Sequence, residues 1–413
     1  MEVIQFPSFE TFPYLATFQN LYMPNKKSTL SVMSKPLRDF IQLEYASGII
    51  LLAGVLIAIV WANSSWYDGY HHLWETMLPL GWDNFKLDLS LHAWINDGLM
   101  AVFFFVIGLE LKREFLEGEL SSVKKAMLPM SAALGGMIVP ALIYFLFNKN
   151  TDAANGWGIP MATDIAFALA LLSMAGKHVP LSVKVFLSAL AVADDLGAVL
   201  VIAFFYTAEI NFSMLGLGAV FLIVLFAGNR MNVKSSWFYL VIGLVVWVCF
   251  LLSGVHATIA GVLVAFTIPI STNKGYSPLK KMEHVLHPWV AFLIMPIFAL
   301  ANSGIVIGSG FLSNIVNAVS LGITTGLVLG KFIGILLFTW LMVKFKFGVL
   351  PEGSTWRHIT GVALLGGVGF TMSLFIGGLA FDNPTHVEQA KYGILIASVV
   401  AGIAGSIVLK KAK

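Results

Sequence analysis

Apolar runs long enough to cross a lipid bilayer recur along nearly the whole of this 413-residue chain. A membrane-spanning helix needs about 20 mainly apolar residues. Charged residues make up only 11% of the chain, whereas soluble domains carry about 25%. Hydrocarbon must therefore be the solvent for most of the chain, and the runs predict an all-α polytopic membrane protein with twelve transmembrane helices. The predicted spans are 46–62, 94–110, 126–147, 157–175, 182–206, 214–228, 237–252, 254–270, 285–304, 319–343, 357–381 and 390–409.

The basic residues predict how these spans are oriented. If both termini lie in the cytoplasm, 20 of the 25 Lys and Arg residues fall in the inside loops, and only Lys86, Lys149 and Lys391 fall outside. Cytoplasmic loops of membrane proteins are enriched in Lys and Arg. We therefore expect both termini in the cytoplasm. The formal net charge of +3 is too small to indicate a nucleic-acid partner.

The N-terminal segment 1–43 differs from the remainder of the chain. It carries Glu2, Glu10 and scattered prolines, with no basic region ahead of a long apolar core. We therefore expect a cytoplasmic extension rather than a signal peptide, followed by a twelve-helix domain over 44–413. The single cysteine, Cys249, cannot form an internal disulfide, so redox chemistry is not expected.

Two neighbouring carboxylates in the fifth predicted span are the sharpest functional signal. Asp194 and Asp195 lie within the apolar stretch 187–202. Desolvation and mutual repulsion both oppose two charges there unless a cation or a proton is present. Such a pair can exchange protons for a hard cation, since oxygen ligands suit these ions. The alternative is a structural pair neutralised by neighbouring groups.

Two other predicted spans contain helix-breaking residues. The fourth is interrupted at 158–164, which ends at Asp164, and the eleventh at 366–371. Proline removes a backbone donor and glycine loosens a helix. Paired broken helices in the two halves of a transporter indicate an ion site and inverted-topology repeats. Asp164 near the positive helix ends and Lys331 near the negative ends would offset the partial charges of the broken helices.

Several of these segments also resemble the sequence motifs of NhaA sodium/proton antiporters. The motifs keep the family order from about residue 45 to the C-terminus, and the rule about paired broken helices was itself drawn in part from this family. The matching segments are 96–105, 108–110, 160–168, 194–198, 253–258, 283–289 and 369–373.

The resemblance implies a function and a role for each matching residue. It implies export of one Na⁺ or Li⁺ in exchange for two H⁺, across the bacterial inner membrane. Asp195 would be the essential cation ligand and proton carrier, with Asp194 as its partner. Thr163 and Asp164 would line the crossing of the broken helices, and Na⁺ or Li⁺ would bind at Asp195, Asp194 and Asp164. Lys331 would pair with Asp194 when no cation is bound, and either could carry the second proton.

The same resemblance implies that transport is regulated by pH, that the protein serves pH homeostasis and salt tolerance, and that it forms a homodimer. The candidate pH-sensing residues match positions linked to the cytoplasmic side, and Asp97 is a further intramembrane acid. The loop 63–90 corresponds to the family's interface hairpin. No cofactor is implied, and no nucleotide-binding Gly-Lys-Ser/Thr loop occurs in the sequence. The pH-sensing candidates are His256, Glu110, Glu283, His284 and His287.

Four other interpretations remain open from the residues alone. A solute symporter, or an exchanger that prefers K⁺ or Ca²⁺, would also use a buried acid pair, but no Arg lies in a span to receive a substrate carboxylate. An intramembrane aspartyl protease would need two acids that face each other from separate segments. A channel would lack saturable, proton-coupled flux. The aspartate pair favours a secondary transporter of a small hard cation over an enzyme.

Overall fold

The computed structural model describes residues 45–82, 85–176, 179–207, 210–270, 276–308 and 311–412. The predicted N-terminal extension 1–43 lies outside the described residues. Over the described part, helices dominate and the single pair of strands forms one antiparallel hairpin. The described chain is therefore mostly helical, as predicted, although the all-α prediction did not include this hairpin.

The first half of the described chain contains the hairpin and the helices from α3 to α10. Its elements are α3 (Ala46–Ala62), α4 (Tyr67–Glu75), β1 (Met77–Trp82), β2 (Phe85–Ser90), α5 (Leu91–Ala93), η2 (Trp94–Leu99), α6 (Met100–Glu117), α7 (Val123–Asn148), η3 (Ala154–Met161), α8 (Ile165–Ala175), α9 (Leu181–Phe205) and α10 (Phe212–Arg230).

The second half is entirely helical where it is described. Its elements are α11 (Ser236–Ser253), α12 (Ala257–Thr267), α13 (Pro278–Trp289), η4 (Val290–Ile294), α14 (Met295–Asn302), α15 (Phe311–Ile315), α16 (Ala318–Thr325), η5 (Gly326–Gly330), α17 (Lys331–Lys344), α18 (Trp356–Leu365), α19 (Phe370–Ala380) and α20 (Pro384–Lys411). Of the segments labelled η, η3 is a 3₁₀ helix and the other three are π-helical turns within longer helices.

The described residues contain nine helices that are long and apolar enough to cross a membrane, or eleven if each bent helix pair counts as one span. The twelve predicted spans are therefore only partly reproduced. The predicted span 254–270 contains α12, which is only 11 residues long because it begins after Gly254 and ends before Pro269. Helices α3 and α4 bend by 116°, and α18 and α19 by 42°.

Many of these helices present apolar side chains to the outside, as lipid contact requires. Ile223 on α10 is 67% exposed and Leu244 on α11 is 61% exposed. Soluble proteins rarely expose large contiguous apolar patches. The helix lengths and this exposure together support the prediction that hydrocarbon surrounds the bundle.

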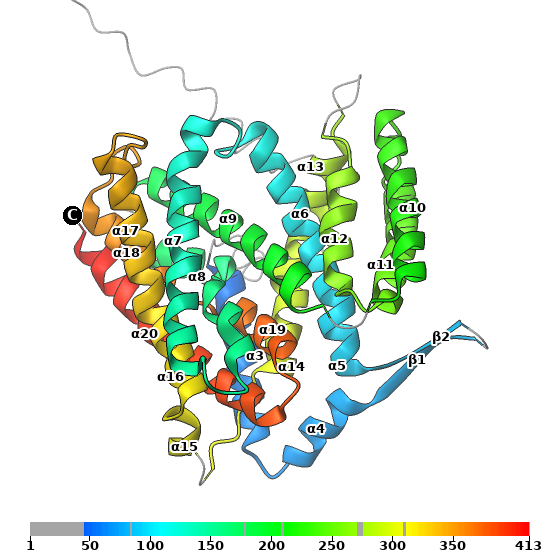
Figure 1. Cartoon of the computed structure of the whole chain (residues 1–413), viewed down its shortest axis with the longest axis horizontal. Helices are drawn as coiled ribbons and strands as arrows, with labels where there is room; N and C mark the ends of the chain where they lie inside the picture. The colour runs from blue at the N-terminus through cyan, green and yellow to red at the C-terminus, as the bar shows by residue number, and fades with distance from the viewer. Residues whose placement is uncertain are drawn as a thin grey trace, which may run out of the picture. The chain divides into compact units, whose positions relative to one another are not determined.

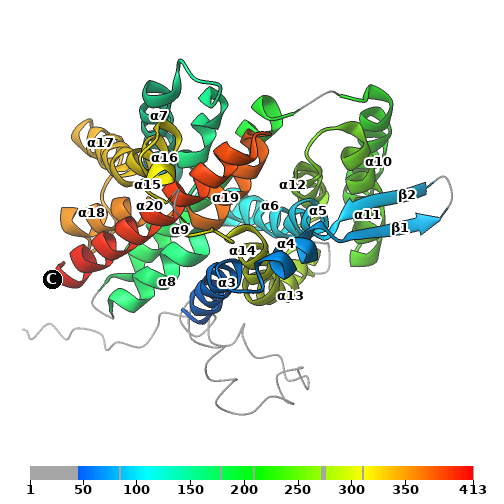
Figure 2. The ribbon, with the colours of Figure 1, turned by 90° about the horizontal axis from the view of Figure 1, so that it is seen from below.

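Two groups of helices pack mainly among themselves. One contains α6, α10, α11 and α12, and the other contains α7, α9, α17, α18 and α20. Figures 1 and 2 show α10–α12 on one side and α17, α18 and α20 on the other. In the second group α7 and α17 meet backbone to backbone, since a Cβ added at Gly334 would lie 2.1 Å from the Gly135 carbonyl oxygen.

The β1–β2 hairpin extends away from the helices on the side of α10 and α11 (Figure 1). Met77 pairs with Ser90, and Leu80 pairs with Leu87. This hairpin falls within the loop predicted to form an interface. Met77, Leu78 and Leu80 are each exposed.

Candidate functional site

Asp194 and Asp195 lie in the middle of α9, and both are almost completely buried, with 1% and 2% of their surfaces exposed. Asp194 forms a salt bridge with Lys331, the first residue of α17, whose side chain is fully buried. The structure therefore brings together a predicted acid and a predicted base that are 137 residues apart in sequence.

Lys331 also contacts the first broken segment. Its ammonium donates a hydrogen bond to Thr163 Oγ1 at 2.9 Å, and the Thr163 hydroxyl donates to the Gly366 carbonyl at 2.8 Å. Gly366 is the C-terminal cap of α18. The positive charge of Lys331 thus reaches the carbonyl end of a helix, where a cation is stabilising.

The two broken segments are joined through their backbones. After η3 the chain is non-helical from Ala162 to Asp164, and a second break separates α18 from α19. The Asp164 amide donates to the Val368 carbonyl at 2.7 Å. The Ser373 hydroxyl donates to the Ile159 carbonyl at 2.9 Å. The breaks expose backbone N–H and C=O groups that a continuous helix would bond internally. Each segment supplies hydrogen-bond partners for the free backbone groups of the other.

Asp164 caps two helices at once. Its Oδ1 accepts from the Phe167 amide of α8 at 3.0 Å. Its Oδ2 accepts from the Thr371 amide of α19 at 3.2 Å and from the Thr371 hydroxyl at 2.5 Å. A carboxylate at a helix N-terminus satisfies free amides and is favoured by the helix dipole. Asp164 therefore lies at the N-termini of both α8 and α19, with both oxygens bonded to the protein.

Unlike Asp194, Asp195 forms no ion pair within the described residues. Its Oδ1 is buried and accepts no hydrogen bond from the described residues, and the same is true of Asp194 Oδ1. A buried carboxylate oxygen without a donor is costly unless a proton or a cation satisfies it. Within the described part of the chain, no three His, Cys, Asp or Glu side chains lie close enough together to hold a metal ion, and this includes Asp164, Asp194 and Asp195.

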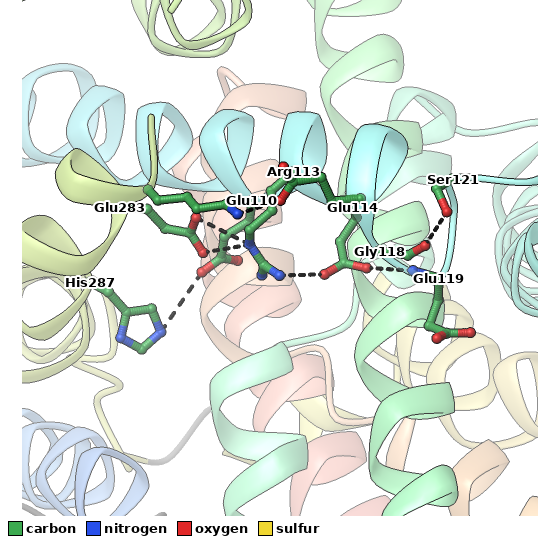
Figure 3. A network of polar contacts seen from close by, with 10 residues as sticks. Glu110, Arg113, Glu114, Gly118, Glu119, Ser121, Glu283 and His287 are labelled. Carbon is green, nitrogen blue, oxygen red and sulfur yellow. Dashed lines mark hydrogen bonds and ion pairs between the residues drawn. The ribbon is translucent and has the colours of Figure 1, made fainter. Parts of the chain in front are cut away.

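Four of the predicted pH-sensing positions lie on α6 or on α13, which packs against it, and Figure 3 shows three of them, Glu110, Glu283 and His287. Arg113 Nε donates to Glu283 Oε1 at 3.0 Å and to Oε2 at 3.2 Å, and Arg113 also pairs with Glu114 at 3.0 Å. His287 Nε2 lies 3.8 Å from Glu110 Oε1. Glu283, His284 and His287 share α13. The structure therefore joins α6 to α13 through a cluster of charged groups.

His256 and Asp97 do not belong to this cluster. Asp97 lies in η2, 13 residues before Glu110, which corresponds to roughly 20 Å along a helix. His256 is the N-terminal cap of α12, which runs beside α6 in the same direction, because Gly261 packs against Ala101 and Ala265 packs against Gly108. The family resemblance grouped His256 with the pH-sensing candidates on the cytoplasmic side, whereas the structure separates it from Glu110 and Glu283.

Three hydroxyl residues at the site were not predicted as site residues. Thr371 bonds Asp164, Ser373 bonds the Ile159 carbonyl, and the Ser398 hydroxyl accepts from the Phe370 amide at 3.2 Å. Each is fully or almost fully buried. The sequence marks such residues only by a hydroxyl in an otherwise apolar stretch beside a helix break. This indication is weak, because Ser and Thr hydroxyls also bond the backbone of their own helix.

Comparisons with known proteins identify the family of this chain. Residues 38–409 match the family described as Na⁺/H⁺ antiporter 1. A relative from Oleidesulfovibrio alaskensis named Na(+)/H(+) antiporter NhaA is 47% identical, over 91% of this chain and 93% of the relative. Na(+)/H(+) antiporter NhaA 1 of Clostridium beijerinckii is 49% identical, over 93% and 97%. Na(+)/H(+) antiporter NhaA 2 of Flavobacterium johnsoniae is 51% identical, over 90% and 91%. On this evidence, the chain belongs to the NhaA family of Na⁺/H⁺ antiporters.

Proposed function

We propose that this protein is a secondary antiporter that exports Na⁺ or Li⁺ in exchange for external H⁺. The observation that carries the proposal is the buried pair on α9, in which Lys331 neutralises Asp194 while Asp195 Oδ1 has no partner among the described residues. The names of the relatives supply the ion pair Na⁺ and H⁺. Asp195 is then the group for which the cation and the proton compete.

The proposed cycle uses one site alternately open to each side. Deprotonated Asp195 binds the cation, and Lys331 releases Asp194 to serve as a second ligand. Thr163 lies beside Lys331 and can supply a neutral oxygen. Asp164 stabilises the ends of α8 and α19, and so supports the site through charge compensation. Movement of one helix group against the other would expose the site outside, where protons displace the cation.

Two protons carried for each cation would make the exchange electrogenic. One net positive charge then enters per cycle, and moving one charge is worth roughly 2.3 kcal/mol per 100 mV of membrane potential. The second proton would be carried by Lys331 or Asp194, because the salt bridge between them opens when the cation binds. A neutral exchange would not depend on the membrane potential.

We further propose that the charged cluster between α6 and α13 regulates transport according to pH. We also propose that the chain crosses the bacterial inner membrane twelve times, as two inverted repeats with both termini in the cytoplasm. The cluster places three acids around one arginine. Changes in their protonation would alter the attraction between the two helices. His256 would act separately, near Asp97. The exposed apolar face of the β1–β2 hairpin is the proposed dimer contact.

The primary test measures collapse of a respiration-generated ΔpH by Na⁺ in everted vesicles. The vesicles would come from a host without its own antiporters, with acridine orange as the reporter. The pH would be scanned from about 6 to 9, which overlaps the range of about 5 to 8 in which His residues titrate. Asp195→Asn should abolish Na⁺- and Li⁺-induced dequenching. Asp152→Asn is the matched control, because the Asp152 side chain is 79% exposed. K⁺ should give no response.

The alternative symporter makes the opposite prediction. A symporter would give no dequenching on addition of Na⁺ alone, because its proton flux requires an organic solute. Full activity of Asp195→Asn would contradict the proposed site. Neither outcome is expected, since the relatives carry the antiporter name and no Arg lies in a predicted span to receive a carboxylate substrate.

A further inference from the structure

The residue that follows α9 makes a direct connection to the first broken segment. Tyr206 is the C-terminal cap of α9, eleven residues after Asp195. Its hydroxyl donates to the Asn155 carbonyl at 2.8 Å and accepts from the Gly158 amide at 3.1 Å. Both partners belong to η3, which runs directly into Thr163 and Asp164. The phenol thus satisfies two backbone groups of an irregular segment.

The backbone at Gly158 packs directly against this hydroxyl. A Cβ added at Gly158 would lie 2.5 Å from the Tyr206 hydroxyl and 3.2 Å from its ring. Glycine is therefore needed for the backbone to approach the phenol so closely. The residues next to them also join η3 to α9, because the rings of Trp157 and Phe205 meet edge to face with centroids 5.0 Å apart.

The backbone of Tyr206 is held from the opposite direction. Its carbonyl accepts a hydrogen bond from His256 Nε2 at 2.6 Å. Because a carbonyl can only accept, Nε2 carries the proton in this bond. The Asn211 amide also donates to the Ser253 carbonyl at 2.8 Å. The end of α9 is therefore attached both to η3 and to the turn between α11 and α12.

We propose that Tyr206 is a positioning residue that keeps Thr163 aligned with the aspartate pair for cation binding. Helix α9 is continuous from Leu181 to Phe205, so its end and its two aspartates move together. The Tyr206 hydroxyl transmits that movement to η3, five residues before Thr163. Without the hydroxyl, η3 is free to shift relative to α9, and the oxygens around the cation lose their spacing. This role rests on the proposed cation exchange.

The first test separates binding from turnover in proteoliposomes. Tyr206→Phe removes only the hydroxyl, together with its two hydrogen bonds to η3. It should raise the KM for Na⁺ at least about fivefold, the factor expected from one net hydrogen bond, with the maximal rate changed less than about twofold. Tyr239→Phe is the matched control, because that hydroxyl bonds the Val233 carbonyl at 3.1 Å and does not contact η3. An unchanged KM in Tyr206→Phe would overturn the role.

A second variant tests the same contact from the η3 side. Gly158→Ala places a methyl group against the hydroxyl and should raise the KM as Tyr206→Phe does. The double variant should be no worse than the more severe single variant, because the hydroxyl that collides with the methyl is gone. Additive effects would show that the two residues act separately and would overturn the link. Gly378→Ala is the control, since an added Cβ there meets nothing within 4 Å.

A third measurement does not depend on transport. Amide hydrogen exchange over residues 154–164 should become about fivefold faster in Tyr206→Phe and stay unchanged in Tyr239→Phe. If the wild-type protein failed to exchange Na⁺ for H⁺, the proposed function would fail while this measurement still tested the link. If transport were normal but the exchange rates were equal, the positioning role alone would be overturned.

Discussion

Lys331 forms its salt bridge with Asp194, and it leaves Oδ1 of the adjacent Asp195 without a hydrogen-bond partner among the described residues. Successive positions on a helix point about 100° apart, so one lysine on a neighbouring helix engages one acid of the pair. The two aspartates, which look equivalent in sequence, therefore occupy different electrostatic environments. This asymmetry gives different predictions for the two residues.

Asp194→Asn should destabilise the protein, whereas Asp195→Asn should not. Removing one partner of a buried ion pair leaves an uncompensated charge, at a cost of about 3–5 kcal/mol. Asp194→Asn should therefore lower the Tm in detergent, and Asp194→Asn/Lys331→Gln should restore much of the loss. Asp195→Asn should abolish transport with an unchanged or higher Tm. Equal Tm values for both single variants would contradict the structural difference between them.

Thr371→Val should weaken the cap that Asp164 provides to α8 and α19. The substitution keeps the shape of the side chain and removes the hydroxyl that donates to Asp164 at 2.5 Å. A hydrogen bond to a charged group contributes roughly 1.5–3 kcal/mol, so both the Tm and the transport rate should fall. Thr360→Val removes a hydroxyl that bonds only the Trp356 carbonyl of its own helix. That control should change the Tm by far less, and a comparable loss would contradict the assignment.

Gly334→Ala should separate α7 from α17 and displace Lys331. The added Cβ would lie 2.1 Å from the Gly135 carbonyl oxygen, and a backbone atom cannot move aside without shifting its helix. Overpacking of this kind costs about 1–3 kcal/mol. Lys331 lies three residues earlier, on the same face of the helix. We expect a lower Tm and a raised KM for Na⁺, measured in detergent and in proteoliposomes.

Gly378→Ala should have the opposite effect on stability. Gly378 lies within α19 and is exposed, and an added Cβ meets nothing within 4 Å. Alanine is favoured over glycine inside a helix by up to about 1 kcal/mol. The Tm should rise slightly and transport should be unchanged. If Gly378→Ala lowered the Tm as much as Gly334→Ala, the loss would follow from replacing any glycine and not from the contact between α7 and α17.

Glu283→Gln should loosen α13 from α6. It removes the carboxylate that accepts two hydrogen bonds from Arg113, although Glu114 still pairs with Arg113. The pair is partly exposed, so its loss should cost only about 1 kcal/mol or less. Amide exchange in the peptide 278–289 should become faster by a few-fold. Glu119→Gln is the control, because Glu119 lies 3.8 Å from Lys125 on the surface, and it should leave that peptide unchanged.

The sequence predicted those features that depend on one segment at a time. Long apolar runs require a membrane whatever their partners, and Asp194 and Asp195 are conspicuous because few charges occur in such runs. Gly158 and Pro160 predict a break before Asp164, because these residues disrupt a helix locally. The contact of Gly334 on α17 with Gly135 on α7 is identified only by the structure.

Tertiary structure decided which of these residues meet. The pairing of Lys331 with Asp194, the attachment of Thr371 to Asp164 and the contact of Tyr206 with η3 each join segments that are 48 or more residues apart. The separation of His256 from Glu110 likewise depends on where α12 begins beside α6. Side-chain type and spacing set what a residue can bind, whereas the helix packing sets the distance to its partner, and both are needed to build an ion site.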